Sequence, residues 1–321
     1  MKTAAADGRR VLVTGASGFA GSHLLDLLTR DGATAIGWCR PGNGLPDASG
    51  RVEWARVDIL DADAVRRAIA AAPPSVVYHC AGAAHTGQSW QQASATLKLN
   101  VLGTHHLLEA LRVHAPDSRV LIPGSALVYG PSDAPLAEDS PLGPKSPYAT
   151  SKLAQEHLGF RVARDEGRRV FLTRSFNHIG PGQDPSFATS SFARQIARIE
   201  AGIGEPVIHV GNLDARRDLT DVRDIVRAYS MIVSLGRPGR IYNACSGQGY
   251  RMADILDRLL AQARTPVTIQ TDADRLRPLD VPVVVGDGRR LRDELGWTPE
   301  IPIERTLGDL LDYWRNRVSA P

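Results

Sequence analysis

A glycine-rich turn between a short strand and a helix constrains this chain more than any other feature. Residues 10–14 (RVLVT) predict a buried strand, GASGFAG follows at once, and an amphipathic helical pattern covers 22–30. Gly15, Gly18 and Gly21 allow a tight turn, close approach of backbone to a pyrophosphate, and close packing of helix on strand. The helix N-terminus adds N–H donors and the positive end of a dipole. Inside a βαβ unit, this arrangement predicts a dinucleotide site.

Strands and helices alternate through the first half of the chain. The predicted strands cover residues 10–14, 34–38, 52–58, 75–79, 119–123 and 170–174, and the main predicted helices cover 22–30, 61–72, 89–114 and 147–166. Asp61 is placed to cap the second of these helices. Such alternation is typical of parallel sheets covered by helices on both faces. We therefore predict an α/β fold with a doubly wound, Rossmann-type parallel sheet.

The pattern changes after Phe176, and glycines and prolines from Gly180 to Pro185 mark a loop. Two helical stretches flank a β-rich segment at 206–210, a helix is predicted over 221–235, and a strand at 241–244 is expected to return to the first sheet. Residues 250–321 predict two helices around an irregular middle. We predict a dinucleotide-binding domain made of 1–178 and 219–246. A smaller, discontinuous α/β substrate domain would then be made of 179–218 and 247–321.

Composition excludes several classes of protein. The 321 residues are 43% hydrophobic, and 38 Lys+Arg against 35 Asp+Glu give a net charge of +3, too small to indicate a nucleic-acid partner. No apolar run reaches the roughly 20 residues of a membrane span, and the N-terminus lacks the apolar core of a signal peptide. Three cysteines without a CxxC pair indicate neither a disulfide framework nor a metal site. We expect a soluble, cytoplasmic enzyme.

The end of the second strand bears on the choice of dinucleotide. NAD sites usually place an Asp or Glu there to accept from the ribose 2′-OH, but the sequence reads Gly37-Trp38-Cys39-Arg40. Arg40 could pair with a 2′-phosphate, or it could be a solvated surface residue. We expect NADP(H) to be preferred, with NAD(H) as the alternative. Asp58, after the third strand, is placed either to accept from the adenine amino group or to cap the next helix.

Three side chains form a candidate reacting centre. Tyr148 and Lys152 in YATSK are four residues apart in a helical pattern, so they share one helix face. A nearby ammonium favours phenolate over phenol, so Lys152 is expected to lower the Tyr148 pKa. The tyrosine could then exchange a proton with a carbinol oxygen. Ser125 follows the fifth strand, at the sheet edge where α/β folds bind ligands, and it either holds the same oxygen or caps a turn.

With these motifs in order, the chain resembles the extended short-chain dehydrogenase/reductases. The resemblance rests on TGASGFAG, the acid at Asp58, NVLGT from Asn100, SALVYG and YATSK. It implies that Ser125, Tyr148 and Lys152 are the catalytic triad, that Lys152 also holds the nicotinamide ribose, and that Asn100 has a structural or catalytic role. The remaining residues expected to line the cofactor site are Phe19, Ile59 and Ala81.

The second half is similar to the subgroup of that family that acts on GDP-6-deoxyhexoses. The similarity rests on RSFNHIGPGQ, ARQIARIEAG, VGNLDARRDLTDVRD and RLRP. Arginines from separate segments would suit a diphosphate, although each alone could be a surface charge. The expected substrate-binding residues are Ser125, Asn177, Arg194, Arg217 and Arg277. Selectivity for guanine follows from the resemblance alone, and His178 is expected to be a packed loop residue.

One position helps to choose among the chemistries of this subgroup. Its dehydratases carry a glutamate where this chain has Leu127, preceded by Ala126, and neither side chain can move a proton. This departure argues against a dehydratase, although the related reductases often carry an acid at the same position. With the dehydratase disfavoured, we predict NAD(P)H-dependent reduction of the C4 keto group of a GDP-4-keto-6-deoxyhexose, giving a product such as GDP-D-rhamnose. A nucleotide-sugar 4-epimerase is the alternative, and a 4,6-dehydratase ranks below it. The complete triad argues against a non-catalytic NADP sensor. The family also implies a homodimer through two long helices.

Overall fold

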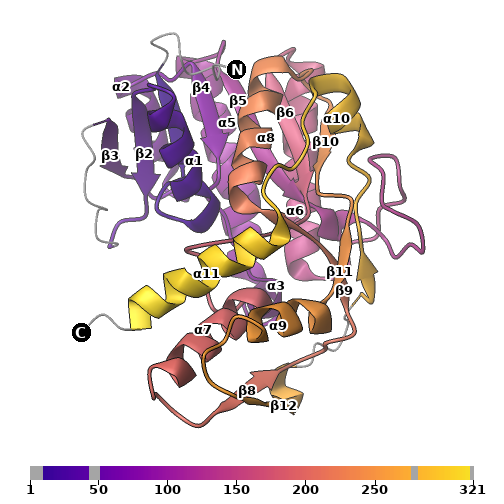
Figure 1. The fold of residues 1–321 in the computed structure, drawn as a ribbon. Helices are drawn as coiled ribbons and strands as arrows, with labels where there is room; N and C mark the ends of the chain where they lie inside the picture. The colour runs from indigo at the N-terminus through magenta and orange to yellow at the C-terminus, as the bar shows by residue number, and fades with distance from the viewer. Residues whose placement is uncertain (1–9, 43–50, 276–280, 319–321) are drawn as a thin grey trace.

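A seven-stranded parallel sheet organises the molecule, as a computed structural model shows for residues 10–42, 51–275 and 281–318 (Figure 1). From one edge to the other, its strands are β3 (Val52–Arg56), β2 (Ala35–Cys39), β1 (Val11–Thr14), β4 (Val76–His79), β5 (Arg119–Ser125), β6 (Val170–Ser175) and β10 (Ile241–Ala244). All neighbouring pairs are parallel. The predicted Rossmann-type sheet is confirmed, including the return of β10 to it.

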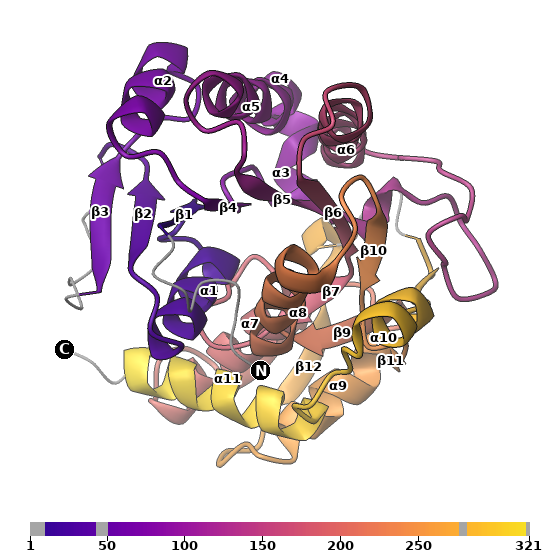
Figure 2. The same ribbon diagram turned by 90° about the horizontal axis from the view of Figure 1, so that it is seen from above.

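Helices cover both faces of this sheet (Figure 2). One face carries α2 (Ala62–Ala71), α5 (Gly103–His114) and α6 (Pro147–Asp165), and the other carries α1 (Phe19–Arg30), α8 (Val222–Leu235) and α10 (Arg289–Leu295). Each layer buries apolar side chains at helical spacing, such as Leu24 and Leu28 of α1 and Leu107 and Leu111 of α5. The predicted cap is also present, because Asp61 accepts from the Ala64 N–H at 2.9 Å.

The strand order reverses between β1 and β4, which are adjacent in the sheet although β2 and β3 lie between them in sequence. After β1 the polypeptide continues to β2 on one side, and after β4 it continues to β5 on the other side. A crevice at the carboxyl ends of the strands is expected where such a reversal occurs, and ligands of open α/β folds bind there. Gly15 follows β1 and Cys80 follows β4, so the glycine turn lies at this point.

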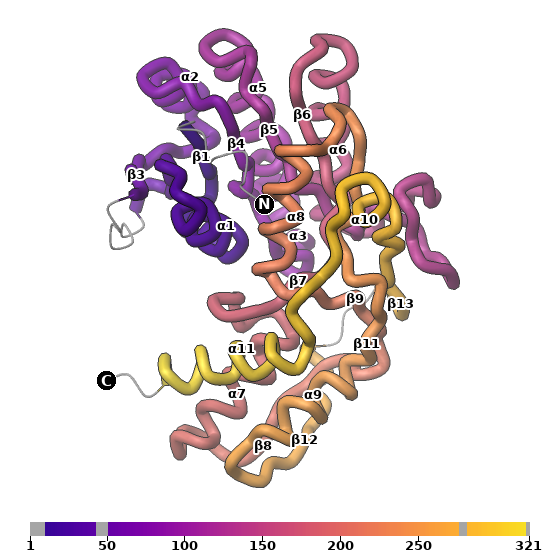
Figure 3. Tube along the Cα trace, turned by 45° about the horizontal axis from the view of Figure 1, so that its top comes forward, coloured from indigo at the N-terminus to yellow at the C-terminus, as the bar shows by residue number. Residues whose placement is uncertain are grey.

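A smaller assembly of helices and short strands lies below the carboxyl ends of the large sheet (Figures 1 and 3). Its strands are β7 (Asn177–Ile179), β8 (Val207–Val210), β9 (Arg216–Asp221), β11 (Gly249–Arg251), β12 (Thr268–Thr271) and β13 (Val283–Val284). β9 pairs with β7, β11 and β13, while β8 pairs with β12. The helices are α7 (Ala188–Glu200), α9 (Met252–Leu260) and α11 (Ile303–Val318), whose apolar faces share one core.

The predicted domain boundaries stay a prediction, and the packing of α10 differs from the assignment of its segment. Its sequence falls in the segment assigned to the substrate domain, yet Leu291 and the following Trp297 are buried in the core of the large sheet. The Trp297 indole donates to the backbone oxygen of Asp224, in α8, at 3.1 Å. Residues 289–297 therefore pack on the large sheet and α8.

The long helix predicted over 89–114 is in fact interrupted. The structure has α3 (Thr86–Gln91), α4 (Ala93–Leu97), a π-helical turn (Lys98–Leu102) and then α5. The π-helical turn contains Asn100, whose side chain binds the backbone after β4. The second helix predicted to flank 206–210 is also wrong, because β9 occupies that region. No helix within the described ranges is long and apolar enough to cross a membrane.

Candidate active site

The glycine turn after β1 has no room for side chains. Gly15 has φ +65°, and a Cβ there would lie 2.6 Å from the backbone nitrogen of Ala81. A Cβ on Gly21 would lie 2.2 Å from the Gly15 oxygen. Gly18 precedes α1, and its N–H donates to the Gly15 oxygen at 3.0 Å. The turn therefore brings bare backbone and a helix N-terminus together, which fits a dinucleotide pyrophosphate.

The residues expected around the rest of a dinucleotide lie near the ends of β2 and β3. Arg40 is exposed directly after β2. Asp58 is exposed after β3, and its carboxylate accepts from the Leu60 N–H at 2.9 Å, so it shapes a turn while Asp61 caps α2. Ile59 is buried against Gly103.

Two further expected residues connect the glycine turn to neighbouring segments. The Phe19 ring stacks on His178 with centroids 5.8 Å apart, so the start of α1 packs against β7. His178 is thus a packed residue in this arrangement, and its Nδ1 lies 3.1 Å from the Phe176 oxygen. The Ala81 N–H donates to Thr14 Oγ1 at 3.2 Å, which links the ends of β1 and β4.

Asn100 holds the loop that follows β4. Its Oδ1 accepts from the Ala83 N–H at 2.8 Å, and its Nδ2 donates to the Ala83 oxygen at 3.3 Å and to Ser151 Oγ at 2.8 Å. The side chain is fully buried. The resemblance left a structural or a catalytic role for Asn100. These contacts support the structural role, because the amide joins the β4 loop to α6.

Ser125 and Tyr148 come together at the carboxyl end of β5. Ser125 is buried, and its Oγ accepts from the Leu127 N–H at 3.2 Å. Tyr148 lies in the first turn of α6, where Ser146 caps the helix and the Tyr148 N–H donates to Ser89 Oγ at 3.2 Å. Burial raises the pKa of Tyr148, and a hydrogen bond with the Ser125 side chain opposes this rise.

Lys152 lies behind this pair and points toward the sheet. Its ammonium donates to the Pro123 oxygen at 2.6 Å and to Gln155 Oε1. Burial lowers the pKa of Lys152 to about 8, against the opposing effects of Cys80 and Glu156. The prediction that Lys152 lowers the Tyr148 pKa is wrong for this arrangement, because the ammonium is turned to these acceptors and only Ser125 opposes the effect of burial.

A cavity of about 550 Å³ opens beside α7. It is lined by Pro185, Ser186, Ser191, Arg194, Gln195, Arg198 and Arg275. Arg194 lies over the Trp314 ring of α11, 5.6 Å from its centroid, and Arg275 donates to Ser191 Oγ at 3.2 Å. Three guanidinium groups around one cavity suit a diphosphate, since each can bind two phosphate oxygens.

Of the expected arginines that the structure describes, only one lines that cavity. Arg194 does, whereas Arg217 on β9 donates to the backbone oxygens of Arg216 and Pro282. Arg277 lies outside the described residues.

Asn177 is exposed at the start of β7. Sequence reasoning missed Arg198 and Arg275. Arg198 could have been found, because it stands four residues after Arg194 and so shares its helix face.

The segment after Ser125 carries no proton-transferring group. Ala126 and Val128 are buried and Leu127 is half-buried. Glu156 of α6 is a buried acid, but its carboxylate is engaged in an ion pair with Arg174 through two hydrogen bonds of 2.7 and 2.8 Å. Within 10–42, 51–275 and 281–318, no cluster of His, Cys, Asp and Glu has the makings of a metal site.

Comparison with known proteins gives a consistent result. The family model described as GDP-mannose 4,6 dehydratase matches residues 12–310. The chain is 36% identical to a GDP-6-deoxy-D-mannose reductase of Pseudomonas aeruginosa, over 97% of this chain and 98% of that protein. Among solved structures it resembles RMD from Pseudomonas aeruginosa complexed with NADPH, at TM-score 0.84 and 36% identity, covering 96% and 99% of the two chains.

A second solved structure is also similar, MoeE5 in complex with UDP-glucose and NAD. Its TM-score is 0.84 at 29% identity, with 97% of this chain and 100% of that chain covered. The expected resemblance to the extended short-chain dehydrogenase/reductases is confirmed by these matches. The chain belongs to the GDP-mannose 4,6-dehydratase family.

Proposed function

We propose that this protein reduces the C4 keto group of a GDP-4-keto-6-deoxyhexose with NADPH, giving a GDP-6-deoxyhexose such as GDP-D-rhamnose. One observation carries the proposal. Ser125 and Tyr148 are paired beside a segment, residues 126–128, that has no acid or base. Ketone reduction needs one proton donor, whereas 4,6-dehydration needs a further acid/base pair. The similarity to a GDP-6-deoxy-D-mannose reductase over almost the whole chain supports the same choice.

The chain's own groups act on the carbonyl oxygen. The dinucleotide, when bound, supplies the hydride that C4 receives. Ser125 Oγ accepts from the Leu127 N–H, and its single O–H hydrogen would turn from Tyr148 to donate to the C4 oxygen. Tyr148 transfers its phenolic proton to that oxygen as negative charge develops there. Solvent then returns a proton to the tyrosine, and the charge and proton count of the protein are restored.

The residues proposed to hold the dinucleotide follow from their positions. Gly15, Gly18 and Gly21 would receive the pyrophosphate, and Lys152 would contact the nicotinamide ribose. Arg40, exposed where β2 ends, would pair with a 2′-phosphate. The NADPH in the Pseudomonas aeruginosa structure supports NADP(H) as the preferred cofactor, and the NAD in MoeE5 keeps NAD(H) as the alternative.

Gly15→Ala is expected to abolish measurable NADPH binding. The new Cβ would collide with backbone 2.6 Å away at the point where the pyrophosphate must approach. Gly32→Ala is the matched control, because Gly32 also has positive φ, +91°, but open space around its Cβ position. Titration of NADPH by fluorescence measures both. Equal affinities in the two variants would remove the glycine turn from the proposed site.

The cavity beside α7 is proposed to take the nucleotide diphosphate. A neighbouring cavity of about 400 Å³ shares Gln195 and Arg198 with it and would take the base. Arg275→Met is expected to weaken GDP binding by roughly 10- to 100-fold, because a charge-assisted hydrogen bond is lost. Calorimetry with GDP tests this, and the exposed Arg292→Met is the control. Unchanged GDP affinity in Arg275→Met would place the diphosphate elsewhere.

A homodimer is proposed through the face that carries α5 and α6, which lie side by side (Figure 2). Leu102, Val113 and Phe160 expose large apolar side chains there. Phe160→Glu is expected to convert dimer to monomer in light scattering coupled to gel filtration, with the His157→Gln variant of α6 remaining dimeric. A monomeric unmodified protein would refute this arrangement. The three cysteines are free thiols, which supports a reducing compartment, and we propose the cytoplasm.

A further inference from the structure

A buried chain of hydrogen bonds runs from Lys152 to the strand before the glycine turn. Lys152 Nζ donates to Gln155 Oε1, and Gln155 Nε2 donates to Thr104 Oγ1 at 2.7 Å. Thr104 Oγ1 lies 2.9 Å from His79 Nε2, and His79 Nδ1 lies 2.8 Å from Thr14 Oγ1. These five side chains come from α6, α5, β4 and β1, and each is at most 9% exposed.

The direction of each bond follows from the hydroxyl of Thr104. That hydroxyl has one hydrogen, which it donates to the Asn100 oxygen at 2.7 Å. It must therefore accept from both Gln155 and His79, so His79 carries its proton on Nε2. Burial, aided by the charge of Lys152, lowers the pKa of His79 to about 3, which keeps the ring neutral. Nδ1 is then an acceptor for the Thr14 hydroxyl.

The same reasoning fixes the amide of Gln155. Its NH₂ group faces Thr104, so its carbonyl oxygen faces Lys152. A reversed amide would place NH₂ against the ammonium, two donors facing each other with no acceptor between them. Lys152 consequently has two acceptors on the sheet side, Gln155 and the Pro123 oxygen at 2.6 Å. An ammonium has a third donor, which the proposed contact with the dinucleotide would use.

We propose that Gln155 is a positioning residue for Lys152, and that Thr104 and His79 fix the direction of the Gln155 amide. One hydrogen-bond network would then hold side chains at both ends of the dinucleotide site: Lys152 at one end, and at the other Thr14, which immediately precedes Gly15. The inference rests on the proposed function in one respect, that Lys152 contacts the bound dinucleotide.

The charges of the other titratable groups near Lys152 must stay the same when Gln155 is changed. Glu156 and Tyr148 lie on the same helix, and His79 at the end of β4 and Cys80 directly after it interact electrostatically with Lys152. Glu156 is held by Arg174. Burial raises the pKa of the Cys80 thiol to about 12, so it stays neutral in the working range. Changes at Gln155 therefore alter the acceptor for Lys152 while the charges of its other neighbours stay the same.

The sequence makes a direct measurement practical, because it has only four lysines: Lys2, Lys98, Lys145 and Lys152. Carbon-13 labelled lysine gives few NMR signals, and Lys152→Met identifies the relevant one. Titration of the unmodified protein is expected to give a Lys152 pKa of about 8. Gln155→Met removes an acceptor of the charged form and is expected to lower the Lys152 pKa.

Two further variants and a control separate positioning from general damage. Gln155→Glu brings a carboxylate to the ammonium and is expected to raise the Lys152 pKa. Thr104→Val releases the amide and is expected to lower it, as Gln155→Met does. His157→Gln, at an exposed position on α6, is expected to leave it unchanged. Opposite shifts in Gln155→Met and Gln155→Glu support the proposal, and equal or absent shifts overturn it.

NADPH affinity measured across the same pH range supplies the second readout. A lysine binds the ribose best while it is charged, so affinity falls as pH rises through the Lys152 pKa. In Gln155→Met this loss is expected to begin at a lower pH than in the unmodified protein. If the pH at which NADPH affinity begins to fall does not follow the Lys152 pKa from one variant to the next, the link between Gln155 and the dinucleotide site is overturned. If the unmodified protein fails to bind NADPH while the lysine shifts occur, the proposed function is wrong and the positioning role is supported.

Discussion

Replacing Tyr148 by phenylalanine lowers kcat for the reduction of the 4-keto sugar by about 10²- to 10⁴-fold, while NADPH affinity changes little. The phenolic oxygen is the proton donor in the proposed step, and Phe keeps the ring that packs at the start of α6. Stopped-flow measurement of NADPH oxidation with saturating substrate gives kcat, and NADPH titration gives the affinity. Activity equal to that of the unmodified protein would remove Tyr148 from the mechanism.

The pH profile supplies a second test of the same residue. Burial raises the Tyr148 pKa, so the phenol stays protonated through neutral pH and is available as a donor. The rate of reduction is expected to stay level there and to fall as pH rises through the Tyr148 pKa. In Tyr148→Phe that fall disappears from the residual rate. Tyr129→Phe is the control, because its hydroxyl bonds to Asn243, away from Ser125, at 2.7 Å.

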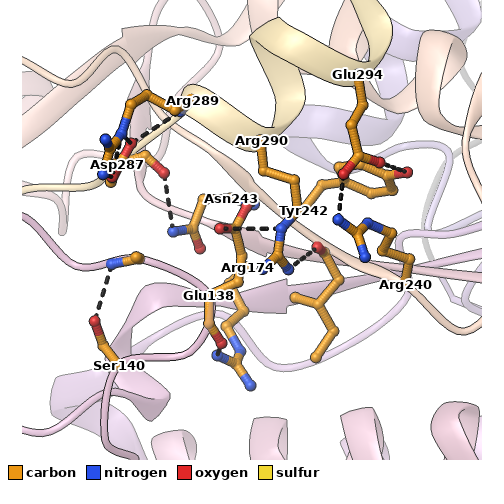
Figure 4. Close-up of polar contacts among 12 residues, drawn as sticks. Glu138, Ser140, Arg174, Arg240, Tyr242, Asn243, Asp287, Arg289, Arg290 and Glu294 are labelled. Carbon is orange, nitrogen blue, oxygen red and sulfur yellow. Dashed lines mark hydrogen bonds and ion pairs between the residues drawn. The ribbon is translucent and has the colours of Figure 1, made fainter.

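Glu156→Ala lowers the free energy of unfolding by about 3–5 kcal/mol, the largest expected loss of stability from a single change. Arg174 and Glu156 are 4% and 5% exposed and share two hydrogen bonds. Arg174 also donates to the backbone oxygen of Glu138 at 2.9 Å, beside Asn243 and Arg290 (Figure 4). Removing the carboxylate leaves a guanidinium buried without its ionic partner, which costs far more than an exposed charge.

Urea unfolding followed by circular dichroism measures this loss. The double variant Glu156→Ala with Arg174→Met is expected to recover part of it, because the stranded charge is also removed. Asp165→Ala breaks the exposed pair with Arg164 and is expected to leave the transition unchanged. If Glu156→Ala lowers the free energy of unfolding only slightly and the double variant does not raise it again, the prediction is wrong, and water or neighbouring oxygens replace the carboxylate.

The dinucleotide half of the fold could be predicted because its signals are local. The apolar runs of β1 and β4, the periodic pattern of α2 and its Asp61 cap all lie within a few residues of the structure they specify. The short strands of the smaller assembly could not be predicted in this way. β12 is exposed along its whole length, and β9 begins with two arginines, so pairing partners distant in sequence determine both.

The candidate site divides in a similar way. Gly15 and Ser125 were recognised because motif and position after a strand coincide, and Tyr148 because it stands four residues before Lys152 in a helical pattern. The environment of Lys152 depends on Gln155, Thr104 and His79, which come from three different elements, and no spacing in the sequence brings them together. The expected Arg217 and the observed Arg275 show the same limit. Arg217 lies on β9, whereas Arg275 follows β12, which pairs with the sequence-distant β8.

The most direct test of the central claim is to supply GDP-4-keto-6-deoxymannose with NADPH or NADH and to follow loss of the reduced cofactor while identifying the sugar product. The proposed function predicts stoichiometric oxidation, faster with NADPH, and a single GDP-6-deoxyhexose. Interconversion of nucleotide hexoses without net oxidation would instead show an epimerase. Release of a 4-keto sugar from GDP-mannose would show a dehydratase and contradict the role assigned to Leu127.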